Sequence, residues 1–103
     1  MRDRLHDDAM ADLFLREPSV AAELLDEILE DGYQAELMTA LRQLTKAFGG
    51  VTAVAERANL NKTQAYRTLS ADGNPTVASL RCILKAMGLR IAIKPIQTHN
   101  HAV

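Results

Sequence analysis

The sequence has little of several residue types that define other classes of small protein. Its 103 residues include one cysteine, no tryptophan, two tyrosines, two phenylalanines, five glycines and three prolines. A single cysteine excludes both a disulfide framework within the chain and a zinc finger built on cysteines. No apolar run approaches the roughly 18 residues of a membrane span. These absences indicate a soluble globular protein, and the length suits one domain.

Motifs of secreted proteins, enzymes and cofactor-binding proteins are also missing. Residues 1–8 carry five charged side chains and no apolar segment of the kind found in signal peptides, so we expect a cytoplasmic protein. The sequence has no glycine-rich phosphate loop and no HExxH motif. Cys82 has no base close to it in the sequence, because all three histidines lie in terminal segments. We expect no enzymatic activity, no cofactor and no metal site.

Charge is present in ordinary amount but is divided unevenly along the chain. Residues 1–36 carry eleven acidic residues and three arginines, a net charge of −8. Residues 37–103 carry nine lysines and arginines against Glu56 and Asp72, a net charge of +7. The basic part suggests contact with an anionic partner such as nucleic acid. The acidic part either faces a basic partner or keeps the protein soluble.

Apolar residues recur at helical spacing through most of the chain. Their spacing, together with glycine, proline and asparagine at the breaks, predicts six short helices. These are expected over about 4–15, 20–32, 37–48, 51–58, 62–70 and 77–87. Gly49 and Gly88 are the residues expected to end the third and the sixth. The predicted fold class is all-α, a bundle of five or six helices with a short C-terminal β-strand.

The strand is predicted because the apolar period changes to two between Leu89 and Lys94. Leu89, Ile91 and Ile93 would share one face that covers the helices below, and Pro95 would end the strand. No other segment predicts a strand, so this one has no expected partner within its own chain. We expect it to pair with the same strand of a second chain and to form the dimerisation surface of a homodimer. The alternatives are packing on its own domain or pairing with another protein by β-augmentation.

The domain organisation follows from these elements. Residues 1–96 are expected to form a single helix-turn-helix domain. Its parts are acidic N-terminal helices over 1–32, a DNA-binding core over 33–88 and the strand over 89–94. Residues 97–103 are expected to be a disordered tail.

Two short predicted helices within 50–70, separated by three residues, have the spacing of a helix-turn-helix. Ala55 would lie where the two helices cross, and Leu60 would fill the turn. Ala65 and Leu69 would face inward from the second helix. Such short helices are marginal alone, so packing must stabilise them.

The residues of the turn suit these positions. Asn59 tolerates the left-handed conformation better than most residues. Asn61 is a good N-cap for the second helix, and Gln64 can complete a pair like a capping box.

The second helix of the motif would expose polar side chains opposite Ala65 and Leu69. The exposed residues are Lys62, Thr63, Gln64 and Arg67. Glutamine pairs with adenine through two hydrogen bonds, and lysine or arginine pairs with guanine. No acidic residue occurs over 57–71, which favours a polyanion. We therefore predict that this helix contacts double-stranded DNA.

Four further polar residues are candidate DNA contacts: Thr52, Asn61, Asn74 and Thr76. Thr52 follows Gly49 and Gly50, whose backbone amides could meet a phosphate at the start of a helix. The same two glycines also suit a tight connection. Thr76, or Asn74 before Pro75, suits the N-cap of the sixth helix, and we expect the structural role to dominate for both.

The alternative for the motif is an ordinary helical hairpin with a solvated polar face, because helix-turn-helix patterns are loose. Such a hairpin would belong to a helical interaction module that binds only a protein. Retention on heparin that is lost with salt would separate the two possibilities.

The run from Leu60 to Arg90 and the predicted strand after it resemble the addiction-module antidote proteins, which are HigA-like antitoxins with a Cro/repressor-type helix-turn-helix. The most specific matches are YRTLS at 66–70, DGNPT at 72–76 and LKAMGL at 84–89. The acidic LEDG at 29–32 also matches, so the resemblance covers about 17–94. Ala65 and Asn59 depart from it, standing where the family has a larger aliphatic residue and a glycine.

The resemblance implies a lambda-repressor-like fold and a specific function. It implies an autorepressor that binds its own operator as a homodimer. It also implies a partner, a toxin of the RelE/ParE type encoded beside it. A stand-alone or phage-type regulator without a toxin stays open. The surface over 23–36 is the part of the acidic segment that would meet a basic toxin.

Overall fold

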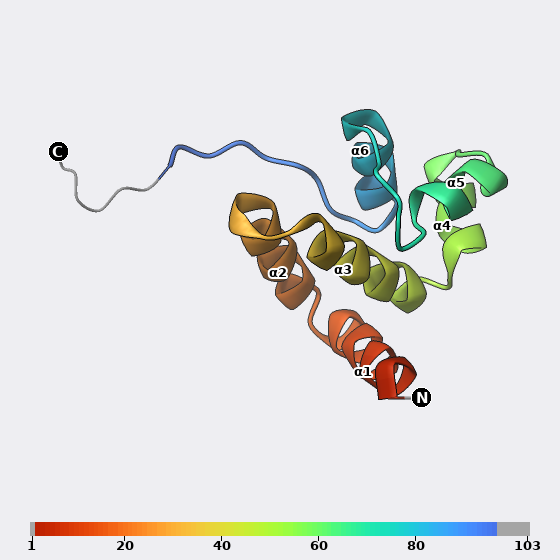
Figure 1. Cartoon of the computed structure of the whole chain (residues 1–103), viewed down its shortest axis with the longest axis horizontal. Helices are drawn as coiled ribbons and strands as arrows, with labels where there is room; N and C mark the ends of the chain where they lie inside the picture. Colours follow the sequence, from red (N-terminus) through yellow and green to blue (C-terminus); the bar gives the residue numbers. More distant parts are fainter. Residues whose placement is uncertain (1, 97–103) are drawn as a thin grey trace, which may run out of the picture.

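The structure, a computed structural model of the chain, describes residues 2–96 (Figure 1). Within this range the chain forms six helices, which confirms the prediction of an all-α fold. They are α1 (Arg2–Arg16), α2 (Pro18–Asp31), α3 (Gln34–Ala47), α4 (Val51–Ala58), α5 (Lys62–Thr68) and α6 (Val77–Ala86). None of these helices has the length and apolar character needed to span a membrane. The predicted tail over 97–103 lies outside the described residues.

Helix α3 occupies the centre of the bundle. It packs against α1 and α2 on one side and against α4 on the other, and α4 in turn packs against α5 and α6. In Figure 1, α1 and α2 therefore lie on the opposite side of α3 from α5 and α6. Leu41 in α3 and Ile83 in α6 are both 0% exposed. One continuous apolar core joins the acidic N-terminal helices to the basic part of the chain.

The helix ends follow local sequence signals. Pro18 stands in the first turn of α2, where its missing N–H costs nothing. The Tyr33 backbone N–H donates to Glu36 Oε1 at 2.8 Å and caps α3. This cap lets α3 begin at Gln34, three residues before the start predicted from apolar spacing. Gly49 and Gly50 have φ of +103° and +100° and turn the chain from α3 into α4.

The segment after α6 differs from its prediction. Residues 89–96 run extended but form no strand, because the described chain supplies no neighbouring strand to complete a ladder of hydrogen bonds. Leu89 and Ile91 pack partly buried against the core, whereas Ile93 is 92% exposed. The expectation that all three would cover the helices is therefore wrong for Ile93. Lys94 Nζ forms an ion pair with Asp26 Oδ2 of α2 at 3.0 Å.

The loop between α5 and α6 depends on a buried glycine. A Cβ atom on Gly73 would lie 2.0 Å from the carbonyl oxygen of Thr68 and 3.0 Å from that of Ser70. The Gly73 N–H also donates to the Ser70 carbonyl oxygen at 2.9 Å. A side chain at this position must push the backbone of the loop away from the end of α5.

We expect Gly73→Ala to lower the free energy of unfolding by about 1–3 kcal/mol, because the added methyl group overpacks this turn. Urea denaturation followed by circular dichroism measures the change. Ala71→Ser, at an exposed position in the same loop, is the control and should stay within about 0.5 kcal/mol of the parent chain. Equal stability of Gly73→Ala and Ala71→Ser would contradict this account of the loop.

Candidate nucleic-acid interface

Helices α4 and α5 are joined by the predicted three-residue turn. Asn59 has φ of 57° and ψ of 42°, the left-handed conformation expected for it. The Leu60 N–H donates to the Ala55 carbonyl oxygen at 2.9 Å and closes the end of α4. Asparagine can adopt this conformation at lower cost than a β-branched residue, so the position does not require glycine.

The contact between the two helices is made by small side chains. Ala55 and Ala65 are 2% and 1% exposed, and Leu69 at the end of α5 is 3% exposed. Leu60 in the turn is partly buried against the same core. The inward positions predicted for these residues are confirmed. Since both alanines are almost fully buried, larger side chains at either position would force α4 and α5 apart.

The first turn of α5 is fixed by its N-cap. The Gln64 backbone N–H donates to Asn61 Oδ1 at 3.0 Å, as the sequence predicts. A capping box would also need a bond between the Gln64 side chain and the Asn61 backbone N–H. The described residues do not make this bond. The Gln64 amide is therefore not engaged at the helix end.

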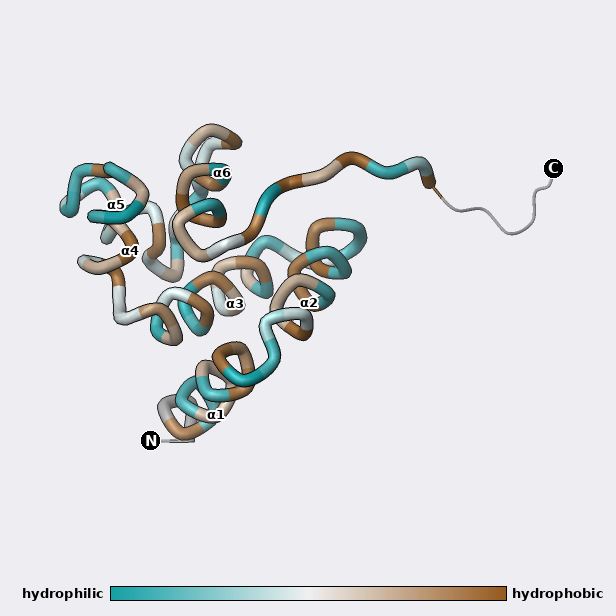
Figure 2. The backbone as a smooth tube through the Cα atoms, turned by 180° about the vertical axis from the view of Figure 1, so that it is seen from behind, coloured by the Kyte–Doolittle hydropathy of each residue, from teal (hydrophilic) through white to brown (hydrophobic). Residues whose placement is uncertain are grey.

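The four side chains predicted to face DNA lie exposed on α5. They are Lys62, Thr63, Gln64 and Arg67. None of the four side chains makes a hydrogen bond or an ion pair to another described residue. Figure 2 shows α5 as a hydrophilic helix at an edge of the molecule, away from α1 and α2. The helix thus presents two cationic groups and one amide to solvent with no internal partner.

Thr52 at the start of α4 is connected to α5 through Tyr66. Thr52 Oγ1 and the Tyr66 hydroxyl lie 3.3 Å apart, within hydrogen-bond distance. Tyr66 is 52% exposed and was not among the predicted site residues. Its position four residues after Lys62, which places both on one face of the helix, is the sequence signal that could have identified it.

Asn74 and Thr76 belong to the loop between α5 and α6, and both have structural roles. Thr76 Oγ1 accepts a hydrogen bond from the Ser79 backbone N–H at 3.0 Å and is the N-cap of α6. Gln34 Nε2 at the start of α3 lies 3.4 Å from Asn74 Oδ1 and 3.4 Å from the Gly73 carbonyl oxygen. These contacts hold the loop against α3.

Comparison with known proteins assigns the chain to a family. The model of the family described as "Probable addiction module antidote protein" matches residues 6–95. The chain belongs to this family. The resemblance noted from 17–94 is therefore confirmed at the level of the family, and the match also includes most of α1.

A curated relative and the solved structures add little to this assignment. A protein of Haemophilus influenzae described as "Uncharacterized protein" is 27% identical over 94 residues, which cover 91% of this chain and 95% of the relative. No solved structure matches the chain. Membership in the antidote family indicates an antitoxin role and implies a toxin as partner.

Proposed function

We propose that this antidote protein is a sequence-specific DNA-binding repressor that acts as the antitoxin of its module. It binds its own operator and neutralises a RelE/ParE-type toxin. The observation that carries the DNA-binding part is the unpartnered polar face of α5, held by the Asn61 cap and by the close contact of α5 with α4. In this proposal α4 and α5 form the helix-turn-helix of a lambda-repressor-like domain.

Each residue of the proposed interface suits a particular part of DNA. Gln64 can form two hydrogen bonds with an adenine edge, and Arg67 can do the same with guanine. Lys62 and Thr63 suit bases or phosphates. The residues at helix starts and in the loop, which are Thr52, Asn61, Asn74 and Thr76, suit phosphate oxygens that position the domain.

Charge supports the same orientation. The chain carries −8 over 1–36 and +7 over 37–103. Because α5 lies away from α1 and α2, the acidic helices would point away from bound DNA (Figure 1). This arrangement reduces repulsion of the phosphates and leaves the acidic surface accessible to a second partner.

The variant Gln64→Ala/Arg67→Ala tests the role of α5. Losing two base contacts should weaken operator binding by about 2–6 kcal/mol and relax specificity, since each paired contact is worth about 1–3 kcal/mol. Fluorescence anisotropy with operator DNA and with unrelated DNA at fixed salt measures both effects. Arg16→Ala removes the same positive charge from an exposed position on α1 and should leave binding unchanged. Operator affinity that survives the double substitution would exclude α5 as the helix that contacts bases.

The acidic surface over 23–36 supports binding of a basic toxin. Glu27, Glu30 and Asp31 are exposed on α2 and make no ion pair with another described residue. Uncompensated charge of one sign steers an oppositely charged partner and raises its association rate. We assign toxin binding to this surface on that ground.

Removing these charges should slow the association with toxin. For Glu27→Gln/Glu30→Gln/Asp31→Asn we expect an association rate at low salt that is lower by roughly tenfold, with a weaker dependence on salt. Surface plasmon resonance with the toxin from the adjacent reading frame measures the rate. The matched control is Asp12→Asn/Glu17→Gln/Glu56→Gln, which removes three exposed charges elsewhere. If both variants associate with toxin equally slowly, net charge alone sets the rate, and the surface over 23–36 has no special role in toxin binding.

The homodimer is proposed from the extended segment after α6. Among the described residues, the backbone of 90–96 makes no hydrogen bond, and Ile93 is almost fully exposed. A two-fold axis would let this segment pair with its own copy in antiparallel register. Leu89, Ile91 and Ile93 would then line the dimerisation surface. Two copies of α5 would be held about 34 Å apart, one turn of DNA.

Ile91→Pro should abolish this pairing, because proline has no backbone N–H to donate. We expect a monomer in sedimentation velocity at micromolar concentration, with unchanged helical circular dichroism. Ile91 is also partly buried, so Ile91→Ala is the matched control; it loses similar packing but keeps the N–H and should stay dimeric. A folded Ile91→Pro variant that is still a dimer would contradict the proposed strand pairing.

A further inference from the structure

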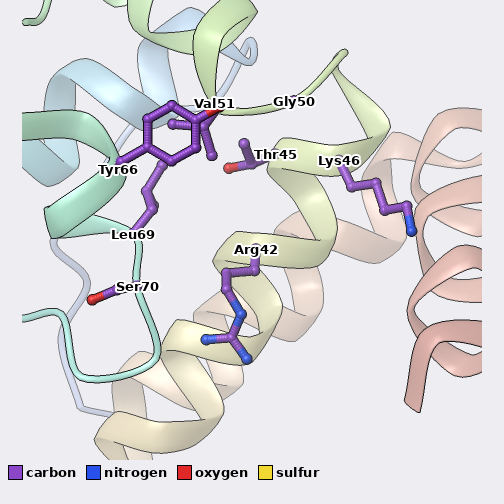
Figure 3. A pocket seen from close by; sticks show the side chains of 8 residues that line it. All are labelled: Arg42, Thr45, Lys46, Gly50, Val51, Tyr66, Leu69 and Ser70. Atoms are coloured by element: carbon purple, nitrogen blue, oxygen red, sulfur yellow. The ribbon is translucent and has the colours of Figure 1, made fainter. Parts of the chain in front are cut away.

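The side chain of Tyr66 bridges the two helices of the motif, α4 and α5. Its hydroxyl oxygen lies 3.3 Å from Thr52 Oγ1 at the start of α4, within hydrogen-bond distance. In Figure 3 the Tyr66 ring lies beside Val51, and its hydroxyl points away from α5 toward α4. Tyr66 is nevertheless 52% exposed. It therefore differs from Gln64 and Arg67, whose exposed side chains make no hydrogen bond to another described residue.

The two hydroxyls carry one hydrogen more than their own contact uses. Either oxygen can be the donor in the bond between Thr52 and Tyr66, and the other hydroxyl then keeps its hydrogen free. Neither hydroxyl has a second partner among the described residues. When Thr52 donates, the free O–H belongs to Tyr66, which is the more exposed of the two. Thr52 then fixes the position of a hydroxyl that is left to donate to a group outside the chain.

The surroundings of this hydroxyl favour an anionic acceptor. A cavity beside the Tyr66 ring is lined by residues of α3, α4 and α5, of which Arg42 and Lys46 are cationic and none is acidic. Tyr66 also lies next to the first turn of α4, and the start of a helix stabilises negative charge. A hydrogen bond to a charged acceptor is roughly twice as strong as one between neutral groups. An anion therefore selects the arrangement in which Thr52 donates to Tyr66 and Tyr66 donates to the anion.

We propose that Tyr66 donates a hydrogen bond to a phosphate of the DNA backbone and that Thr52 positions the Tyr66 hydroxyl for this contact. The inference rests on the DNA-binding function proposed above and adds one contact to it. A phosphate is favoured over a base because the Tyr66 ring is folded back against α4, whereas Gln64 and Arg67 are free to reach a base edge. The contact carries no sequence information of its own. It fixes where α5 lies on the duplex, with the sugar–phosphate chain passing the start of α4.

Tyr66→Phe removes only the hydroxyl and tests the contact. We expect its affinity for operator DNA and for unrelated DNA to fall by a similar factor, at least about threefold, in fluorescence anisotropy at fixed salt. Tyr33→Phe makes the same change in the exposed turn between α2 and α3 and should bind DNA as the parent chain does.

The outcomes separate this inference from the proposed function. A parent chain that binds no DNA overturns both. If the parent chain binds DNA and Tyr66→Phe binds it equally well, only the inference on Tyr66 is overturned. A loss in Tyr66→Phe that is confined to operator DNA would assign Tyr66 to a base and also overturns the phosphate contact.

Neutral phosphates in the operator identify the partner of the hydroxyl. In a series of operators, one phosphate at a time is replaced by methylphosphonate, which carries no charge. At one position this replacement should weaken binding of the parent chain at least about threefold more than binding of Tyr66→Phe, because the variant has already lost that contact. Changes of single bases should show no such coupling with Tyr66→Phe. Equal losses in the two proteins at every phosphate overturn the proposal.

Two substitutions of Thr52 separate positioning from direct contact with DNA. Thr52→Val keeps the shape of the side chain without its hydroxyl and should weaken binding to both DNAs, by less than Tyr66→Phe does. Added to Tyr66→Phe it should have no further effect, since Thr52 acts through Tyr66. Thr52→Ser keeps the hydroxyl and should restore the affinity of the parent chain. A further loss in Thr52→Val/Tyr66→Phe, or equal losses in Thr52→Ser and Thr52→Val, overturns the positioning role of Thr52.

Discussion

Burial of α3 is the constraint on which the other helices depend. Its apolar side is shared by α1, α2 and α4, and Leu41 and Leu44 are 0% and 2% exposed. Helices α4 and α5 have eight and seven residues, and helices this short are not stable alone in water. They persist because Val54 and Leu69 join the core that α3 organises. The proposed DNA-binding face is therefore stabilised by residues that never contact a partner.

The same central helix also keeps the two charged parts of the chain apart. α1 and α2 carry most of the acidic residues and lie on one side of α3, and α5 lies on the other (Figure 1). The pair formed by Lys46 of α3 and Asp8 of α1 joins the two parts directly. A bundle of this kind can offer surfaces of opposite charge to two different partners without either partner blocking the other. This arrangement suits the proposed role, in which an antitoxin also binds DNA.

The features that the sequence predicts well are those set by near neighbours in the chain. Helical spacing, the Asn61 cap and the left-handed Asn59 each depend on residues within about one turn. The features that it missed depend on contacts between distant segments, such as the Thr52–Tyr66 contact and the cavity lined by three helices. The predicted strand failed for the same reason, because it also depends on a segment that is not its neighbour in the chain. Alternation at 89–94 predicts a strand, but the structure has none there, because a strand needs a second strand to pair with and alternation cannot supply it.

The described segment over 90–96, after α6, lacks the backbone hydrogen bonds that the helices make. The described backbone of 90–96 makes no internal hydrogen bond, so its N–H and carbonyl groups are left to solvent or to a partner. Its contact with α2, the Lys94–Asp26 pair, joins two exposed side chains. Ion pairs of this kind are worth about 0–1 kcal/mol. Pairing with another strand would therefore break at most this weak ion pair within the chain. Detaching Leu89 and Ile91 from the core would instead lose the free energy gained by burying their apolar surface. A partner strand should therefore pair with the free backbone edge of the segment, Ile91 included, while the side chains of Leu89 and Ile91 stay packed on the domain.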